Sequence, residues 1–171
     1  MASIREKQGK AVPDVEPLRS VHTSNLPGLF EQLRISLVVS TYQAGKIILI
    51  RNDGGVLNTH FRGFVKPMGI AADALRLTIG GTNTVWYYRN QPAVAQKLKP
   101  AGKYDGCYPP RRIHVTGDID IHELAWDKED ELWVMNTRFG CLCALDADHS
   151  FYPRWGGPLS SAHSRRKTAV T

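Results

Sequence analysis

Apolar and polar residues alternate along several short stretches of this chain, and the longest such stretch runs from Ile113 to His122. One parity carries apolar or small residues, at Ile113, Val115, Gly117, Ile119 and Ile121. Successive side chains of an extended chain point to opposite faces, so this stretch is predicted to be a strand with one aliphatic face. The opposite face would carry the polar residues His114, Thr116, Asp118, Asp120 and His122.

A short helix and a three-stranded unit are predicted before this stretch. Capping hydroxyls at Thr23 and Ser24, followed by apolar residues at helical spacing, predict a helix from Pro27 to Leu33. Aliphatic runs separated by turns that contain Gly or Asn then predict strands at residues 36–41, 46–51 and 56–64.

Later in the chain, a short apolar segment that ends in Asp and is followed by a predicted hairpin occurs twice. Gly69-Ile-Ala-Ala-Asp73 precedes a predicted hairpin, and 54 residues later Glu123-Leu-Ala-Trp-Asp127 precedes another. Three sheets at a spacing of about 40 to 55 residues are typical of propeller blades. We therefore predict an all-β fold, a partial β-propeller of about three blades with a short N-terminal helix. The blades would cover residues 36–64 (without an innermost strand), about 68–110 and about 121–155.

This organisation predicts three parts: a flexible leader over residues 1–22, a propeller-like domain over 23–155 and a disordered basic tail over 156–171. A propeller closes its ring with roughly four to eight blades, so three blades leave two apolar faces open. We expect the chain to be an incomplete propeller, the front part of a longer protein. The alternative is a small β-rich domain that self-associates to cover its open faces.

Composition narrows the class of protein. The chain has 171 residues, 42% of them apolar, and a formal net charge of +6. Four basic residues and no acids lie from Pro153 to Thr171, so the first 152 residues carry only +2 and the charge does not indicate a nucleic-acid-binding domain. No apolar run resembles a signal peptide or a membrane span, and we expect a cytoplasmic protein. The cysteines Cys107, Cys141 and Cys143 lack zinc spacing, and the last two are expected in the core.

Five co-linear motifs are similar to those of one known family. They are STYQAGK, THFRGF followed by PMG, RRIHVTGDIDIHELAW, NTRFGCL and FYPRW, and together they cover roughly residues 25–155. The chain resembles a bacterial family of conserved hypothetical proteins that is classed as a domain of unknown function. The resemblance implies a β-propeller fold and no established activity.

The loop that leads into the third predicted blade carries the candidate metal ligands. Asp118 and Asp120 could supply oxygen ligands to Ca²⁺ or Mg²⁺, and His122 would favour Zn²⁺. His114 and Glu123 are the candidate proton-transfer groups. The alternative is structural, because aspartates at such loops often accept backbone N–H bonds and histidines often satisfy neighbouring groups.

A second set of residues could bind an anionic ligand at the same rim. Arginine side chains recognise carboxylate and phosphate groups, and Asn136 at the end of a predicted strand could reach the same place. The alternative is that these arginines pair with the acids of the loop. The candidates are Arg62, Arg111, Arg112, Asn136 and Arg138.

Three functions are compatible with these residues. The first is a binding or scaffold propeller whose rim recognises a small molecule or a protein partner. The second is a metal-assisted, lactonase-like hydrolase that uses Asp118, Asp120 and His122, with Glu123 or His114 as base. The third and weakest is nucleic-acid contact through the basic residues 165–167.

Overall fold

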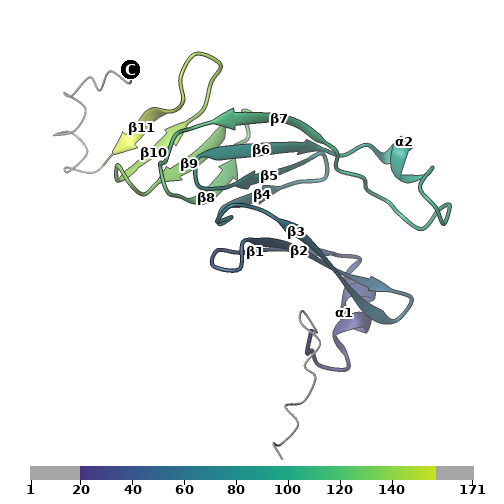
Figure 1. The fold of residues 1–171 in the computed structure, drawn as a ribbon. Coiled ribbons are helices and arrows are strands. Elements are labelled where there is room, and N and C mark those ends of the chain that lie inside the picture. The colour runs from purple at the N-terminus through teal and green to yellow at the C-terminus, as the bar shows by residue number, and fades with distance from the viewer. Residues whose placement is uncertain (1–19, 157–171) are drawn as a thin grey trace, which may run out of the picture.

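The computed structural model describes residues 20–156, which form three antiparallel sheets and two short helices (Figure 1). The predicted all-β class is therefore confirmed. The predicted leader and tail fall mostly on residues 1–19 and 157–171, which lie outside the described residues. No helix in the described part of the chain is long and apolar enough to cross a membrane.

The first sheet contains β1 (Leu37–Thr41), β2 (Lys46–Asp53) and β3 (Val56–Gly63), in that order. Its three strands lie within about two residues of their predicted positions, and no fourth strand joins them among the described residues. Gly45 makes the β1–β2 turn possible, because it has φ of 58° and a Cβ there would lie 2.9 Å from the Phe64 carbonyl oxygen. Helix α1 (Leu26–Leu33) packs on β2 through the buried Phe30.

The other two sheets have four strands each. The second has the order β4 (Ile70–Ala72), β5 (Arg76–Gly80), β6 (Thr84–Arg89) and β7 (Pro110–Val115), with helix α2 (Pro92–Ala95) between β6 and β7. The third has the order β8 (Ile121–Trp126), β9 (Leu132–Asn136), β10 (Cys141–Ala144) and β11 (Tyr152–Gly156). The second sheet thus ends at Val115, not near residue 110.

The predicted continuous strand from Ile113 to His122 is wrong. Strand β7 ends at Val115 in the second sheet, and β8 begins at Ile121 in the third. The backbone turns between them, where Gly117 has φ of 67° and Asp120 has φ of 51°. The polar residues of this stretch therefore do not form one row on one face.

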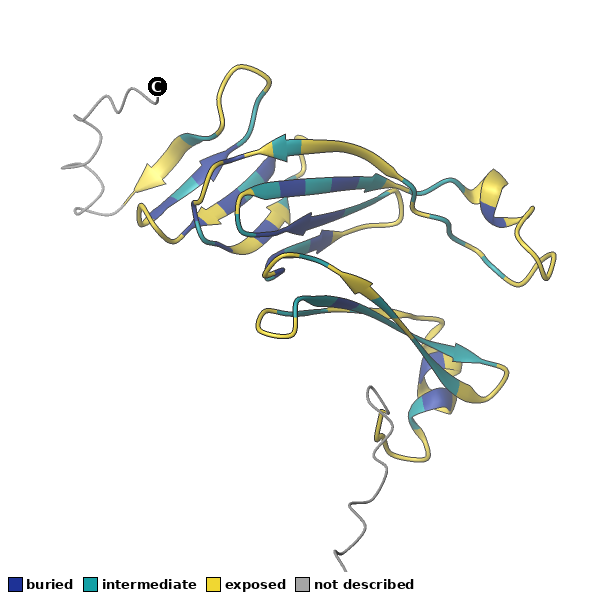
Figure 2. Cartoon of the chain, in the orientation of Figure 1, coloured by how far each residue is buried: buried dark blue, intermediate teal, exposed yellow. Residues whose placement is uncertain are grey.

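The core lies between the second and third sheets, where the buried residues concentrate (Figure 2). Val85 from the second sheet and Val134 and Cys143 from the third are fully buried there. Two glycines allow the sheets to approach closely. A Cβ on Gly69 would lie 2.9 Å from Leu124 Cγ, and one on Gly80 would lie 2.7 Å from Ile121 Cγ2.

The aspartate that ends each repeated phrase braces a turn. Asp73 Oδ1 accepts the backbone N–H groups of Leu75 and Arg76, both at 2.7 Å. Asp127 Oδ1 accepts those of Glu129 at 3.0 Å and Glu131 at 2.8 Å. These backbone bonds, that of Glu131 first, hold the pKa of Asp127 below its usual value. The repeated aspartate thus has a structural role in both sheets.

The second and third sheets differ in where they carry large and small side chains: a small residue in one sheet corresponds to a large residue in the other. In the second sheet, Thr78 on β5 lies opposite Tyr87 on β6. At the corresponding positions of the third, Trp133 lies opposite Ala144. Thr78 Oγ1 accepts a hydrogen bond from Trp126 Nε1 at 3.2 Å, which joins the two sheets.

Candidate functional site

Two neighbouring segments form the exposed edge where the second sheet leads into the third. We call residues 116–120 the rim loop and residues 137–140 the rim turn. The backbone N–H of Arg138 donates to the Ile119 carbonyl at 3.3 Å, and that of Thr137 donates to the Asp120 carbonyl at 3.4 Å. Ile119 is buried and anchors the loop. The polar side chains of the rim are therefore mounted on a fixed backbone.

Four of the predicted site residues form two pairs on this rim. Arg138 donates to Asp118 Oδ2 at 2.6 Å, and both side chains are about half exposed. His122 Nε2 lies 3.7 Å from Asp120 Oδ2. Exposed ion pairs contribute little to stability, typically about 0–1 kcal/mol, so neither pair is needed to hold the fold.

The structure does not assemble the predicted metal row into a three-ligand site. Asp118 is engaged by Arg138, which leaves Asp120 and His122 as a pair. Within residues 20–156, no group of three or more His, Cys, Asp or Glu side chains is placed to hold a metal ion. Protein sites for Zn²⁺ use three or four side-chain ligands, and those for Ca²⁺ use six to eight oxygens.

Asn136 stabilises the rim turn from its buried side. Its side chain is fully buried, and Oδ1 accepts the backbone N–H of Phe139 at 3.1 Å. Its Nδ2 has no hydrogen-bond partner among the described residues. The nearby Cys143 thiol is a weak acceptor, and burial raises its pKa to about 12 although Asn136 opposes the shift. Asn136 therefore supports the rim and is not exposed on it.

The two predicted proton-transfer residues lie apart. His114 on β7 has Nε2 at 2.8 Å from the Ser150 carbonyl oxygen, in the loop between β10 and β11. Glu123 is exposed on β8, where the pairing with β9 shifts by one residue between Ile121 and Leu124. This bulge leaves both His122 and Glu123 exposed, which the sequence pattern did not predict.

Only one of the predicted arginines lies on the rim. The guanidinium of Arg112 stacks on the Tyr87 ring at 4.0 Å, on the face of the second sheet that meets the third. Arg62 is exposed on β3 of the first sheet. Arg111 is exposed on β7. Of the predicted arginines, Arg138 is thus the one that pairs with an acid of the rim loop.

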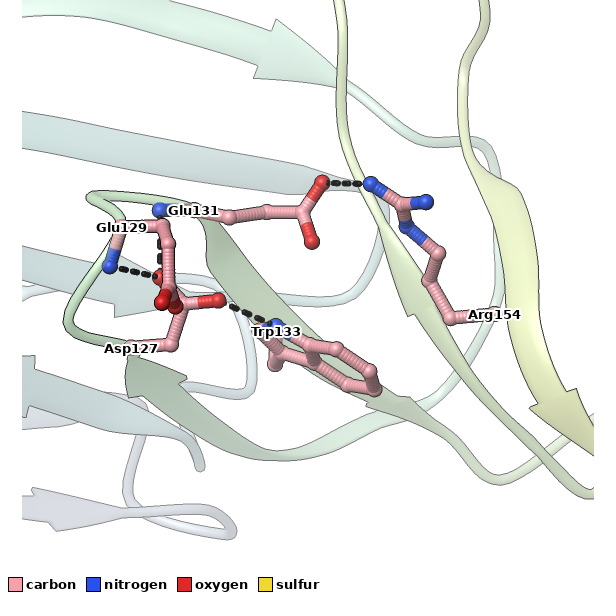
Figure 3. A pocket seen from close by; sticks show the side chains of 5 residues that line it. All are labelled: Asp127, Glu129, Glu131, Trp133 and Arg154. Carbon is pink, nitrogen blue, oxygen red and sulfur yellow. Dashed lines mark hydrogen bonds and ion pairs between the residues drawn. The ribbon is translucent and has the colours of Figure 1, made fainter.

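A shallow pocket of about 460 Å³ lies on the outer face of the third sheet, lined by Asp127, Glu129, Glu131, Trp133 and Arg154 (Figure 3). Trp133 Nε1 donates to Asp127 Oδ2 at 2.9 Å, and Arg154 pairs with Glu131. This ion pair first, and a hydrogen bond from a tyrosine second, lower the pKa of Glu131. We call the pocket lined by these five residues the acidic pocket. Sequence reasoning missed it because Arg154 meets Glu131 only through the pairing of β11.

The fold and the rim define an all-β protein of three antiparallel sheets with a polar edge. The chain belongs to the DUF4915 family, a domain of unknown function, whose sequence model matches residues 24–166. This confirms the expected membership of a family of unknown function, and the match extends beyond the expected end near residue 155. No curated protein and no solved structure matches the chain significantly.

Proposed function

We propose that this chain is a binding or scaffold protein of the β-propeller type, with its ligand site on the rim loop and rim turn. The stacking of successive sheets supports the propeller arrangement. Strands β4 and β8 lie at corresponding ends of the second and third sheets and pack against each other. In a propeller such strands line the central channel, and the loops leading into them form the rim where ligands bind.

The observation that carries this proposal is the exposed pair of Arg138 and Asp118 on a fixed backbone. A guanidinium recognises carboxylate and phosphate groups through parallel hydrogen bonds. Because an exposed ion pair is worth little, an anion can replace Asp118 at small cost. The ligand class is therefore a small molecule with a carboxylate or phosphate group, and an acidic side chain of a protein partner offers the same chemistry.

The test uses inorganic phosphate and succinate as probes, with binding followed through the NMR amide signals of Gly117 and Gly140. The wild-type chain should show weak, saturable shifts. Asp118→Asn should bind the probes several-fold more tightly because it removes the competing carboxylate, and Arg138→Gln should lose the shifts. Arg89→Gln, an exposed arginine outside the rim, is the matched control. Equal binding by Arg138→Gln and wild type would refute the site.

The alternative function is a metal-assisted, lactonase-like hydrolase that uses Asp118, Asp120 and His122, with Glu123 or His114 as base. The distance of 3.7 Å between Asp120 and His122 favours it. Asp118 would have to leave Arg138 to join them, so metal binding and the ion pair compete. Removing Arg138 would therefore have opposite effects under the two functions: it would free Asp118 for a metal, but it would remove the group that binds an anion.

Calorimetric titration with Zn²⁺ or Ca²⁺ separates the two functions. Arg138→Gln should tighten metal binding several-fold if Asp118 is a ligand, whereas it abolishes anion binding under the first proposal. Hydrolysis of a simple γ-lactone would be measured in parallel with and without chelator. Absence of metal binding in both wild type and Arg138→Gln would exclude the hydrolase.

A further inference from the structure

The ion pair of Arg138 and Asp118 joins two segments of the rim that are also joined through their backbones. Arg138 Nη2 lies 2.6 Å from Asp118 Oδ2, and the two side chains are 54% and 51% exposed. The backbone N–H of Arg138 donates to the carbonyl of Ile119, the residue next to Asp118, at 3.3 Å. The guanidinium and the carboxylate are therefore held as neighbours by more than their own attraction.

Asp118 stays close to Arg138 when the ion pair opens, because the rim loop is anchored on both sides of it. On one side, Thr116 is 2% exposed, and its N–H donates to the Asn83 carbonyl at 3.0 Å. On the other side, Ile119 is 1% exposed and belongs to the core cluster. A ligand that displaces Asp118 from Arg138 therefore still has the Asp118 carboxylate as a close neighbour.

The charges around the pair are mainly negative. Residues 116–123 and 137–140 carry three carboxylates, on Asp118, Asp120 and Glu123, and a single guanidinium. A ligand that carries only negative charge is attracted by the guanidinium but repelled by these carboxylates. Two like charges about 4 Å apart repel each other in water by enough to weaken binding about five-fold. A simple anion is therefore a poor match for this rim.

A ligand with one positive and one negative group avoids this repulsion. Its carboxylate can bind Arg138 while its ammonium group donates to Asp118, so both charges of the opened ion pair regain an opposite partner. Because the two protein groups are neighbours, the two charges of the ligand must also lie close together. An α-amino acid meets this requirement, since its ammonium and carboxylate groups are attached to the same carbon.

We propose that the rim binds free α-amino acids as zwitterions, with the carboxylate on Arg138 and the ammonium group on Asp118. This inference rests on the proposed function and narrows its ligand from any carboxylate or phosphate to a zwitterion. Asp118 is then a binding residue and not only a competitor for Arg138. The carboxylates of Asp120 and Glu123 favour the positive end of the ligand.

The test compares three probes that share one skeleton: alanine, which is a zwitterion, N-acetylalanine, which is an anion, and alaninamide, which is a cation. Binding is followed through the NMR amide signals of Gly117 and Gly140. The wild-type chain should bind alanine about five-fold more tightly than either of the other two probes. A fourth probe, ε-aminocaproate, has its two charges far apart and should bind no more tightly than N-acetylalanine.

Asp118→Asn is the decisive variant, because it should affect two probes in opposite directions. It should weaken alanine binding several-fold by removing the partner of the ammonium group. It should tighten N-acetylalanine binding several-fold by removing a negative neighbour. Arg138→Gln should lose the binding of both probes. The matched control is Asp148→Asn, an exposed aspartate between β10 and β11, which should change neither.

Two outcomes would overturn this inference and leave the proposed anion site intact. One is equal binding of alanine and N-acetylalanine by the wild-type chain. The other is tighter binding of both probes by Asp118→Asn, which would mean that the ammonium group has no partner there. Absence of binding for alanine, phosphate and succinate alike would overturn the proposed site together with this inference. Dispersed amide spectra verify that each variant is folded.

Discussion

Gly80→Ala tests the packing of the second sheet on the third, because two physical effects predict opposite signs for it. Alanine in a strand is favoured over glycine by about 0.5–1 kcal/mol, so an unhindered substitution stabilises the fold. In the structure the new methyl carbon would lie 2.7 Å from Ile121 Cγ2, well inside the ordinary contact distance of about 3.5–4.0 Å. Overpacking of this kind costs about 1–3 kcal/mol.

The net expectation is a loss of about 1–2 kcal/mol in the free energy of unfolding. Urea denaturation followed by tryptophan fluorescence measures it, and the midpoint should fall by about 0.5–1 M for a slope near 2 kcal/mol/M. Gly63→Ala is the matched control, because Gly63 also lies in a strand and a Cβ there meets nothing within 4 Å. The double variant with Ile121→Leu, which removes Cγ2, should recover part of the loss. A midpoint that rises with Gly80→Ala as with Gly63→Ala would refute the packing of the two sheets.

Three further predictions follow from single contacts. Thr78→Val should destabilise the fold by about 1–3 kcal/mol by leaving the Trp126 N–H without its acceptor, whereas Thr78→Ser should not; urea denaturation of both variants decides this. The Arg154 ion pair holds the pKa of Glu131 below its usual value, so its stabilisation is present above the pKa of the unfolded chain and is lost as pH falls through the folded pKa; Glu131→Gln should flatten the acid side of the stability profile, and an unchanged profile would contradict this. Burial raises the pKa of Cys143 to about 12, so its thiol should resist iodoacetamide at pH 8 in the native chain and react after unfolding, as peptide mass spectrometry would show.

Local patterns predicted the strands and hairpins well because each is a short-range signal. Gly45, with positive φ, closes a turn between two aliphatic runs, so the limits of the three strands of the first sheet were predicted within about two residues. The Ile113–His122 stretch failed for a physical reason. Ile119 continues the apolar parity, yet it is buried as the anchor of a loop and not as part of a strand.

The site was predicted only in part because it depends on contacts between distant segments. The sequence placed the polar residues at the loop before β8, but Arg138 meets Asp118 from the following hairpin. That pairing decides whether Asp118 is available to a metal. Asn136 was predicted to bind a ligand, whereas its burial under the rim turn depends on the packing of the whole third sheet. The residue types thus indicated which ligands the site could bind, whereas tertiary contacts determine which of these side chains is free to bind one.

The exchange of large and small side chains between the second and third sheets has a consequence for engineering. Thr78 with Tyr87 and Trp133 with Ala144 occupy corresponding positions, so the two sheets present surfaces of different relief. A chimaera that puts a copy of the third sheet in place of the second would place Trp133 where Thr78 contacts Trp126 and Ala144 where Tyr87 contacts Trp126, producing a clash at the first position and a void at the second. The side chains at these positions therefore specify which sheet occupies which place. A consensus repeat with the same side chains in every sheet would lose that specificity.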